Sequence, residues 1–162
     1  LARATEKLGI PLVTNEVPVS PWTPQTYDDG TMEDAQLRGV RPLAWGPLGG
    51  DPSGGANFLF KVHWPANSVN DVRQRNIRKM LQLVGADMGY PEDVVALAWT
   101  LRHPAGIVPI IGSMNATRNA MQAAMAPTAA SQMTRQQWWQ IADVSGGGVW
   151  GVPFPMLPPR QK

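Results

Sequence analysis

The class of fold is set by the stretch Gly106-Ile-Val-Pro-Ile-Ile-Gly-Ser-Met-Asn-Ala-Thr-Arg118. Its first half, Gly106 to Ile111, is apolar and is typical of a short strand that is buried on both faces. Gly112 and Ser113 end that strand, and Asn115 is placed to cap a helix that follows directly. A strand that runs straight into a helix is one unit of an α/β fold.

The same alternation precedes this stretch. Strands are expected at Pro11–Ser20 and Val40–Trp45, and Thr31 is expected to cap the short helix between them. A long irregular connection, 51–67, then leads to a helix capped by Ser68, with a stripe of Val69, Val72, Ile77, Met80, Leu81, Val84 and Met88. Further helices are expected at 92–102, 116–126 and 135–144, the last opened by a capping box of Thr134 and Gln137. Three strands that alternate with helices predict a parallel sheet and an α/β class.

Composition limits the range of functions. The chain has 162 residues, of which 43% are hydrophobic and 16% charged, as expected for one globular domain. It has no cysteine, which excludes disulfides and thiolate metal sites and favours a cytoplasmic location. No apolar run reaches the roughly 18 residues of a membrane span, and no secretory leader is visible. Leu1 opens a helix-like stretch, so we expect the chain to be the later part of a longer protein.

The net charge of +2 gives no indication of nucleic-acid binding. The densest basic cluster, Arg73, Arg75, Arg78 and Lys79, is expected to be a solvated helix face.

Ser113, Asn115 and Arg118 form the first candidate site. A helix N-terminus presents unpaired amides and a partial positive charge, so it binds anions. Ser113 adds a hydroxyl, and the guanidinium of Arg118 suits a phosphate. The alternative, equally open from these residues alone, is that Ser113 and Asn115 only cap the helix and that Arg118 is solvated.

The second candidate site is Ala44-Trp-Gly-Pro-Leu-Gly49, at the carboxyl end of a strand, where α/β proteins place their ligands. The indole of Trp45 could stack on a flat heterocycle, and the turn lets backbone amides approach phosphates. A core tryptophan followed by an ordinary turn is the open alternative.

Taken in order, four motifs resemble the second half of an aldo-keto reductase. They are Asn15-Glu16 with Ser20-Pro21, Ala44 to Gly50, Leu97-Ala-Trp-Thr-Leu-Arg-His-Pro104, and Ile107 to Ser113 continued to Arg118. The resemblance covers most of the chain except the 51–67 connection and the tail. It is strongest to a bacterial-type subgroup of oxidoreductases.

The resemblance implies a partial (β/α)8 TIM barrel over residues 1–145, with strands six to eight, their helices and an accessory C-terminal helix, followed by a Gly/Pro-rich tail, 146–162. It implies reduction of a small carbonyl substrate, an aldehyde or ketone, by hydride transfer from NADPH without a metal. The family's cofactor contacts then fall on Glu16 and Trp45 at the nicotinamide, Gly46 and Leu48 at the pyrophosphate, Ser113, Asn115 and Arg118 at the 2′-phosphate, and Gln122 near the adenine.

The chain also departs from the family pattern. Glu16 replaces a Gln and cannot donate a hydrogen bond, and Gly112 stands where many members carry Lys. The family's catalytic Asp, Tyr, Lys and His belong to the barrel's first half, and neither Tyr27 nor Tyr90 matches the Tyr. We therefore nominate no catalytic residue and expect this chain alone to be inactive.

The alternative function is a stand-alone half-barrel pseudoenzyme that binds a nucleotide or a protein partner. In either case the open sheet edges of a half-barrel are expected to favour self-association.

Overall fold

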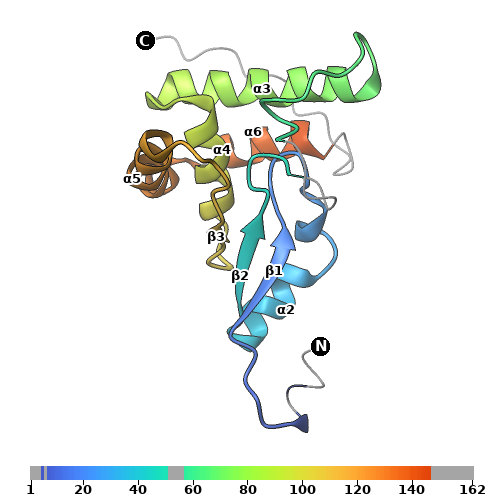
Figure 1. Cartoon of the computed structure of the whole chain (residues 1–162), viewed down its shortest axis with the longest axis vertical. Helices are drawn as coiled ribbons and strands as arrows, with labels where there is room; N and C mark the ends of the chain where they lie inside the picture. The colour runs from blue at the N-terminus through green and yellow to red at the C-terminus, as the bar shows by residue number, and fades with distance from the viewer. Residues whose placement is uncertain (1–4, 6, 51–56, 147–162) are drawn as a thin grey trace.

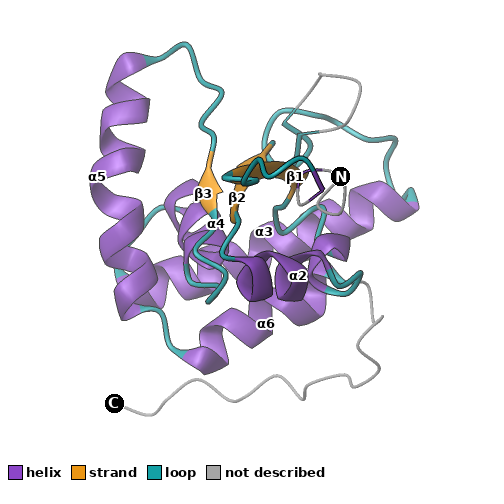
Figure 2. Ribbon diagram, turned by 90° about the horizontal axis from the view of Figure 1, so that it is seen from below, coloured by secondary structure: helices purple, strands orange, loops and turns teal. Residues whose placement is uncertain are grey.

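The computed structural model describes residue 5, residues 7–50 and residues 57–146. The predicted tail lies outside these residues, apart from Gly146. The described part contains a parallel sheet of three strands in the order β1-β2-β3 and a set of helices packed mainly against one of its faces (Figures 1 and 2). The predicted α/β class with a parallel sheet is thus confirmed.

The strands are shorter than the sequence predicts. They span β1 (Thr14–Pro18), β2 (Arg41–Trp45) and β3 (Val108–Pro109). Leu43 is the central partner, because it pairs with Glu16 on one side and Val108 on the other. Side chains alternate along a strand, so Glu16, Leu43 and Trp45 project from one face, while Val17 and Ala44 project into the core from the other.

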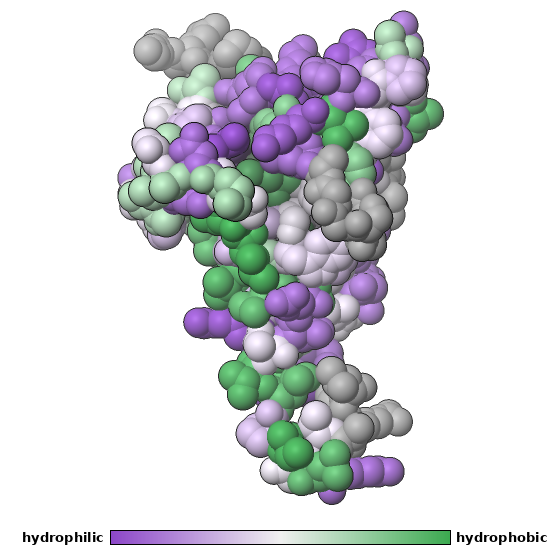
Figure 3. Space-filling view, in the orientation of Figure 1, coloured by the Kyte–Doolittle hydropathy of each residue, from purple (hydrophilic) through white to green (hydrophobic). Residues whose placement is uncertain are grey.

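The first of these faces carries no helix among the described residues. Val108 and Ile110, which the sequence analysis expected to be buried on both faces, are 38% and 40% exposed. That expectation is wrong for this chain because β3 is the last strand of the described sheet, and no described element covers the face from which Val108 and Ile110 project. Figure 3 shows apolar side chains gathered on this side of the molecule, over the sheet and below it.

The helices follow the predicted order. They are the 3-10 helix η1 (Gln25–Tyr27), α2 (Thr31–Arg38), α3 (Val69–Met88), α4 (Glu92–Leu101), α5 (Ala116–Gln132) and α6 (Arg135–Ser145). None of the helices described here is both long and apolar enough to cross a membrane.

Ser68 caps α3 and Asn115 caps α5 as predicted, and the Thr134–Gln137 capping box is present. The cap of α2 was predicted wrongly: Gly30 is the N-cap, and Asp29 accepts from the Thr31 amide instead.

α4 is the centre of the helical layer. Every residue from Asp93 to Thr100 is buried, so α4 is enclosed on all sides rather than along one apolar stripe. The reason is its surroundings, since α3, α5 and β3 all contact it. Its far end is tied to α6 by two reciprocal bonds: the Trp99 Nε1 donates to the Trp138 carbonyl at 3.0 Å, and the Trp138 Nε1 donates to the Trp99 carbonyl at 2.9 Å.

Only half of the basic cluster of α3 is the solvated face that its sequence indicates: Arg75 and Lys79 are exposed, whereas Arg73 and Arg78 have partners elsewhere in the fold. The Arg73 guanidinium donates to the carbonyls of Trp22 (2.6 Å) and Ser145 (2.9 Å) and lies 4.4 Å from the Trp22 ring centroid. Burial lowers the pKa of Arg73 from its ordinary value. Arg78 pairs with Glu92 at 2.7 Å. The predicted stripe of α3 is likewise wrong at its start, where Val69 is 83% exposed.

Gly85, within α3, is required by a close approach of backbone. A Cβ at this position would lie 2.4 Å from the Tyr90 carbonyl oxygen, well inside van der Waals contact. In an unobstructed helix, Gly→Ala stabilises by about 1 kcal/mol. Here we expect Gly85→Ala to lower the free energy of unfolding by about 2 kcal/mol, because the clash is with main chain that cannot turn away.

Urea denaturation of Gly85→Ala measures this effect. Ala86, the next residue and an exposed one, provides the reference, since Ala86→Gly should cost only about 1 kcal/mol of helix propensity. A Gly85→Ala protein more stable than the wild type would show that the chain after α3 adjusts freely.

Candidate functional site

A pocket of about 280 Å³ lies at the carboxyl ends of β2 and β3. Five segments line it: the turn after β2, the loop before α3, α4, the chain at and after the end of β3, and the first two turns of α5. Its lining residues are Gly46, Pro47, Leu48, Gly50, Asn57, Lys61, Leu97, Ile110, Ile111, Gly112, Ser113, Arg118 and Gln122. The structure therefore brings the two candidate segments of the sequence, 44–49 and 106–118, into one pocket.

The turn after β2 depends on two glycines in contact. Gly46 has φ +60°, and a Cβ on it would lie 2.7 Å from the Gly50 Cα. The amides of Gly49 and Gly50 both donate to the Gly46 carbonyl, at 2.9 and 3.0 Å. Without side chains at either end, the main chain forms part of the pocket wall, as the approach of a phosphate requires.

The start of α5 forms the opposite wall. The Asn115 side chain caps the helix by accepting from the Arg118 amide at 3.0 Å. The Ser113 Oγ accepts from the Asn115 amide at 3.1 Å, which leaves its own proton free to be donated. Ser113 lines the pocket, whereas Asn115 acts only as a cap in this structure.

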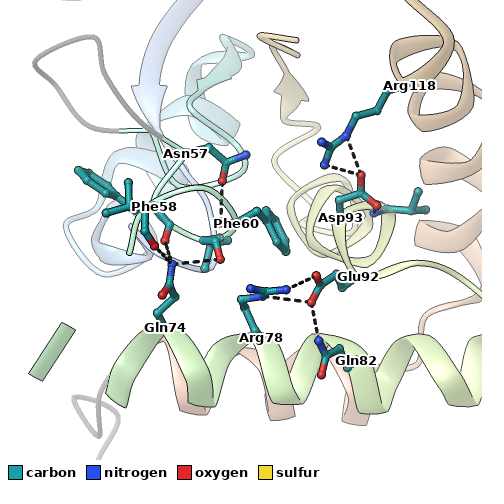
Figure 4. A network of polar contacts seen from close by, with 12 residues as sticks. Asn57, Phe58, Phe60, Gln74, Arg78, Gln82, Glu92, Asp93 and Arg118 are labelled. Atoms are coloured by element: carbon teal, nitrogen blue, oxygen red, sulfur yellow. Dashed lines mark hydrogen bonds and ion pairs between the residues drawn. The ribbon is translucent and has the colours of Figure 1, made fainter. Parts of the chain in front are cut away.

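Arg118 is held by a carboxylate. Its Nε and Nη2 donate to the same oxygen, Oδ2 of Asp93, at 3.1 and 2.9 Å (Figure 4). The Gln122 Nε2 donates to that oxygen at 2.8 Å. Asp93 is the second residue of α4, and the exposed fraction of its side chain is 10%. The other polar atom of the Gln122 side chain, Oε1, is buried and has no hydrogen-bond partner among the described residues.

Lys61 is a pocket residue that the sequence analysis missed. It is exposed, lines the pocket together with Asn57, and forms no ion pair within the described part of the chain. Its loop is fixed by Gln74 of α3, whose buried Nε2 donates to the carbonyls of Phe58, Leu59 and Val62 (Figure 4). No local pattern indicates this contact, which joins residues 12 to 16 positions apart.

Two predicted site residues lie elsewhere. Glu16 is exposed on β1, and Trp45 is half-buried at the end of β2. Both project from the open face of the sheet, and neither lines the pocket. Gly46, Leu48, Ser113, Arg118 and Gln122 are thus brought together, whereas Glu16 and Trp45 form a separate pair of positions beside them.

A second cavity, about 710 Å³, lies among the helices and is lined by Tyr27, Asp28, Glu33, Arg102, His103, Pro104, Arg135, Trp138 and Trp139. The His103 Nδ1 accepts from the Ala105 amide at 3.2 Å, and its ring packs against Tyr27. Burial lowers the pKa of His103, and the nearby carboxylate of Glu33 only partly opposes this decrease.

Among the described residues, no group of three or more acidic, His or Cys side chains could hold a metal ion.

The role of the Gln74 contacts can be tested by a single substitution. Gln74→Glu keeps the side-chain shape but replaces the one donor to three carbonyls with a second acceptor. We expect the free energy of unfolding to fall by about 3 kcal/mol, since a buried carboxylate would face unpaired carbonyl oxygens.

Chemical denaturation of Gln74→Glu at neutral pH tests this. Gln36→Glu on the exposed surface of α2 adds the same charge and should change the stability by less than about 0.5 kcal/mol. Equal, small effects of both substitutions would mean that Gln74 does not hold the loop.

The chain is similar to several known proteins. The sequence model of the Aldo/keto reductase family matches residues 1–145. A 6-dehydroglucose reductase of Novosphingobium aromaticivorans is 30% identical over 147 residues, which are 91% of this chain and 43% of that protein. The oxidoreductase YdhF of Escherichia coli is 36% identical over 145 residues, 87% of this chain and 42% of its own.

A solved structure supports the fold. The thermostable aldo-keto reductase Tm1743, crystallised with the inhibitor epalrestat, aligns with a TM-score of 0.63 and 17% identity over 89% of this chain and 44% of its own. The chain spans less than half the length of each of these relatives. The family match over residues 1–145 shows that this chain belongs to the aldo/keto reductase family.

Proposed function

We propose that this chain is the cofactor-binding part of an NADP(H)-dependent aldo-keto reductase, which reduces aldehydes or ketones by hydride transfer. One observation carries the proposal: the pocket at the strand ends gathers a glycine turn, a serine hydroxyl and two cationic side chains, Lys61 and Arg118. The carboxyl ends of parallel strands are where barrel enzymes bind their ligands. When bound, the nicotinamide cofactor supplies the hydride.

The pocket fits the phosphate and adenine parts of the cofactor. The main chain of the Gly46–Gly50 turn would lie against the pyrophosphate, with Lys61 as the nearest free cation of the lining. Ser113 and the remaining donors of Arg118 would hold the 2′-phosphate. The orphaned, buried Oε1 of Gln122 lacks a donor, and the exocyclic amino group of adenine would provide one.

The nicotinamide end is proposed for the open face of the sheet. Glu16 and Trp45 project there from adjacent strands, two register positions apart, since Glu16 pairs with Leu43 and Trp45 with Pro18. The catalytic Asp, Tyr, Lys and His of the family are assigned to the part of the barrel that this chain does not contain, so the chain alone is expected to turn over no substrate. Since two of the curated relatives are named 6-dehydroglucose reductases, a carbonyl-bearing sugar is the first substrate class to test with a longer protein.

Nucleotide binding to this chain tests the proposal. Calorimetry should detect NADPH, and Arg118→Met should weaken its affinity about tenfold or more, because a charge-assisted hydrogen bond contributes about 1.5–3 kcal/mol. Arg75→Met serves as the control, since Arg75 pairs with Asp71 on the exposed side of α3. Binding that is equally weakened by both variants, or absent in the wild type, would refute the assignment of the pocket.

We also propose that the uncovered sheet face associates with a second copy when the chain stands alone. Val108 on β3 and Ile110 just after it are large apolar side chains left exposed there, at 38% and 40%. Their burial against like surface would remove them from water.

Light scattering after size exclusion measures this association. The wild type should elute as a dimer or larger at 100 µM, and Val108→Lys should shift it toward monomer. Leu37→Lys on α2, where Leu37 is 84% exposed, should leave the mass unchanged. A wild type that is monomeric at 100 µM would contradict the proposal.

A further inference from the structure

The carboxylate of Asp93 already occupies the anion-binding side of Arg118. Two of the five guanidinium donors and the amide of Gln122 converge on one oxygen, Oδ2, at 2.8 to 3.1 Å. This is the arrangement in which an arginine and an amide normally receive a phosphate oxygen. The pocket therefore contains, directly behind its principal cation, a fixed negative charge.

Asp93 has no role in capping that would explain its position. α4 begins after Pro91 without a side-chain cap, and the Oδ1 of Asp93 accepts only from the amide of Val94, at 3.0 Å. A neutral residue would satisfy that amide equally well. The acidic charge is matched instead to Arg118, from which it lies 25 positions away in the sequence.

The charged side chains at this part of the pocket come from three elements. Arg118 lies on α5, Asp93 on α4, and Lys61 in the loop before α3. Glu92, the neighbour of Asp93, is turned to Arg78 and Gln82 of α3 (Figure 4). A dianionic group placed against Arg118 thus meets one cation that Asp93 largely neutralises, while Lys61 stands on another segment of the lining.

We propose that Asp93 is a specificity-determining residue of the nucleotide pocket, which reduces its preference for a 2′-phosphorylated adenosine over an unphosphorylated one. This inference rests on the proposed function, because it concerns the same pocket. Asp93 takes up two of the donors of Arg118, and its charge opposes a phosphate on the 2′-hydroxyl. The pocket accordingly accepts NAD(H) as well as NADP(H).

Two probes that differ only by the 2′-phosphate, 2′,5′-ADP and 5′-AMP, isolate the effect. Both dissociation constants are measured by calorimetry on the whole chain. The 5′-AMP constant divided by the 2′,5′-ADP constant should rise about tenfold in Asp93→Asn, because only 2′,5′-ADP binds more tightly. Asp93→Glu keeps the charge and should retain the wild-type ratio. Asp34→Asn removes a carboxylate that pairs with Arg38 on α2, and it should also leave the ratio unchanged.

A second comparison guards against misfolding of Asp93→Asn, because removal of both partners of a buried pair is tolerated better than removal of one. The double variant Arg118→Met/Asp93→Asn should bind 2′,5′-ADP about tenfold more tightly than Arg118→Met. Circular dichroism confirms that each variant is folded.

The outcomes separate the two proposals. If the wild type and all variants bind neither probe, the pocket is not a nucleotide site and both proposals fall. If both probes bind but Asp93→Asn changes their affinities by the same factor, Asp93 is merely structural and only this inference is overturned. A selective gain for 2′,5′-ADP, absent from Asp93→Glu and Asp34→Asn, supports it.

Discussion

The burial of α4 is the constraint on which the rest of the structure depends. A helix enclosed along eight consecutive residues cannot leave polar groups unpaired, because an uncompensated charge in such a place costs several kcal/mol. Its two acidic residues, Glu92 and Asp93, therefore require partners, and they find them on different helices. Glu92 binds Arg78 of α3, and Asp93 binds Arg118 of α5. The start of α4 thus fixes the helices on either side of it.

The other end of α4 is fixed just as firmly. The indoles of Trp99 and Trp138 stack at 5.2 Å, and each donates its N–H to the backbone of the other residue. Each of these large side chains removes much apolar surface from water while keeping its one polar atom bonded. α6 is consequently held along the helical layer. At its C-terminal end, the Ser145 carbonyl accepts a hydrogen bond from the guanidinium of Arg73.

Local patterns in the sequence predict the parts of this fold that depend on local chemistry. The order of strands and helices, the caps at Ser68 and Asn115, and the Thr134–Gln137 box were all correct because neighbouring residues determine them. The tertiary role of charged residues was not predictable in this way. Arg73, Gln74 and Asp93 read as ordinary polar helix residues, yet their partners lie 12 to 72 positions away. The glycines and the arginine of the pocket were predicted, whereas Lys61 was not, because distant contacts such as those of Gln74 bring its loop there.

The same distinction separates the two ends of the candidate site. The phosphate end is assembled from segments that the described residues hold from every side: a glycine turn, a loop fixed by Gln74, and an arginine fixed by Asp93. The positions assigned to the nicotinamide, Glu16 and Trp45, stand on a sheet face that the described chain leaves uncovered. An exposed side chain is free to change rotamer, so orientation of a reacting ring requires walls that close around it. Under the proposed function, this chain would hold the adenosine part of the cofactor and set the selectivity for it, whereas alignment of the hydride would require walls around the open face of the sheet.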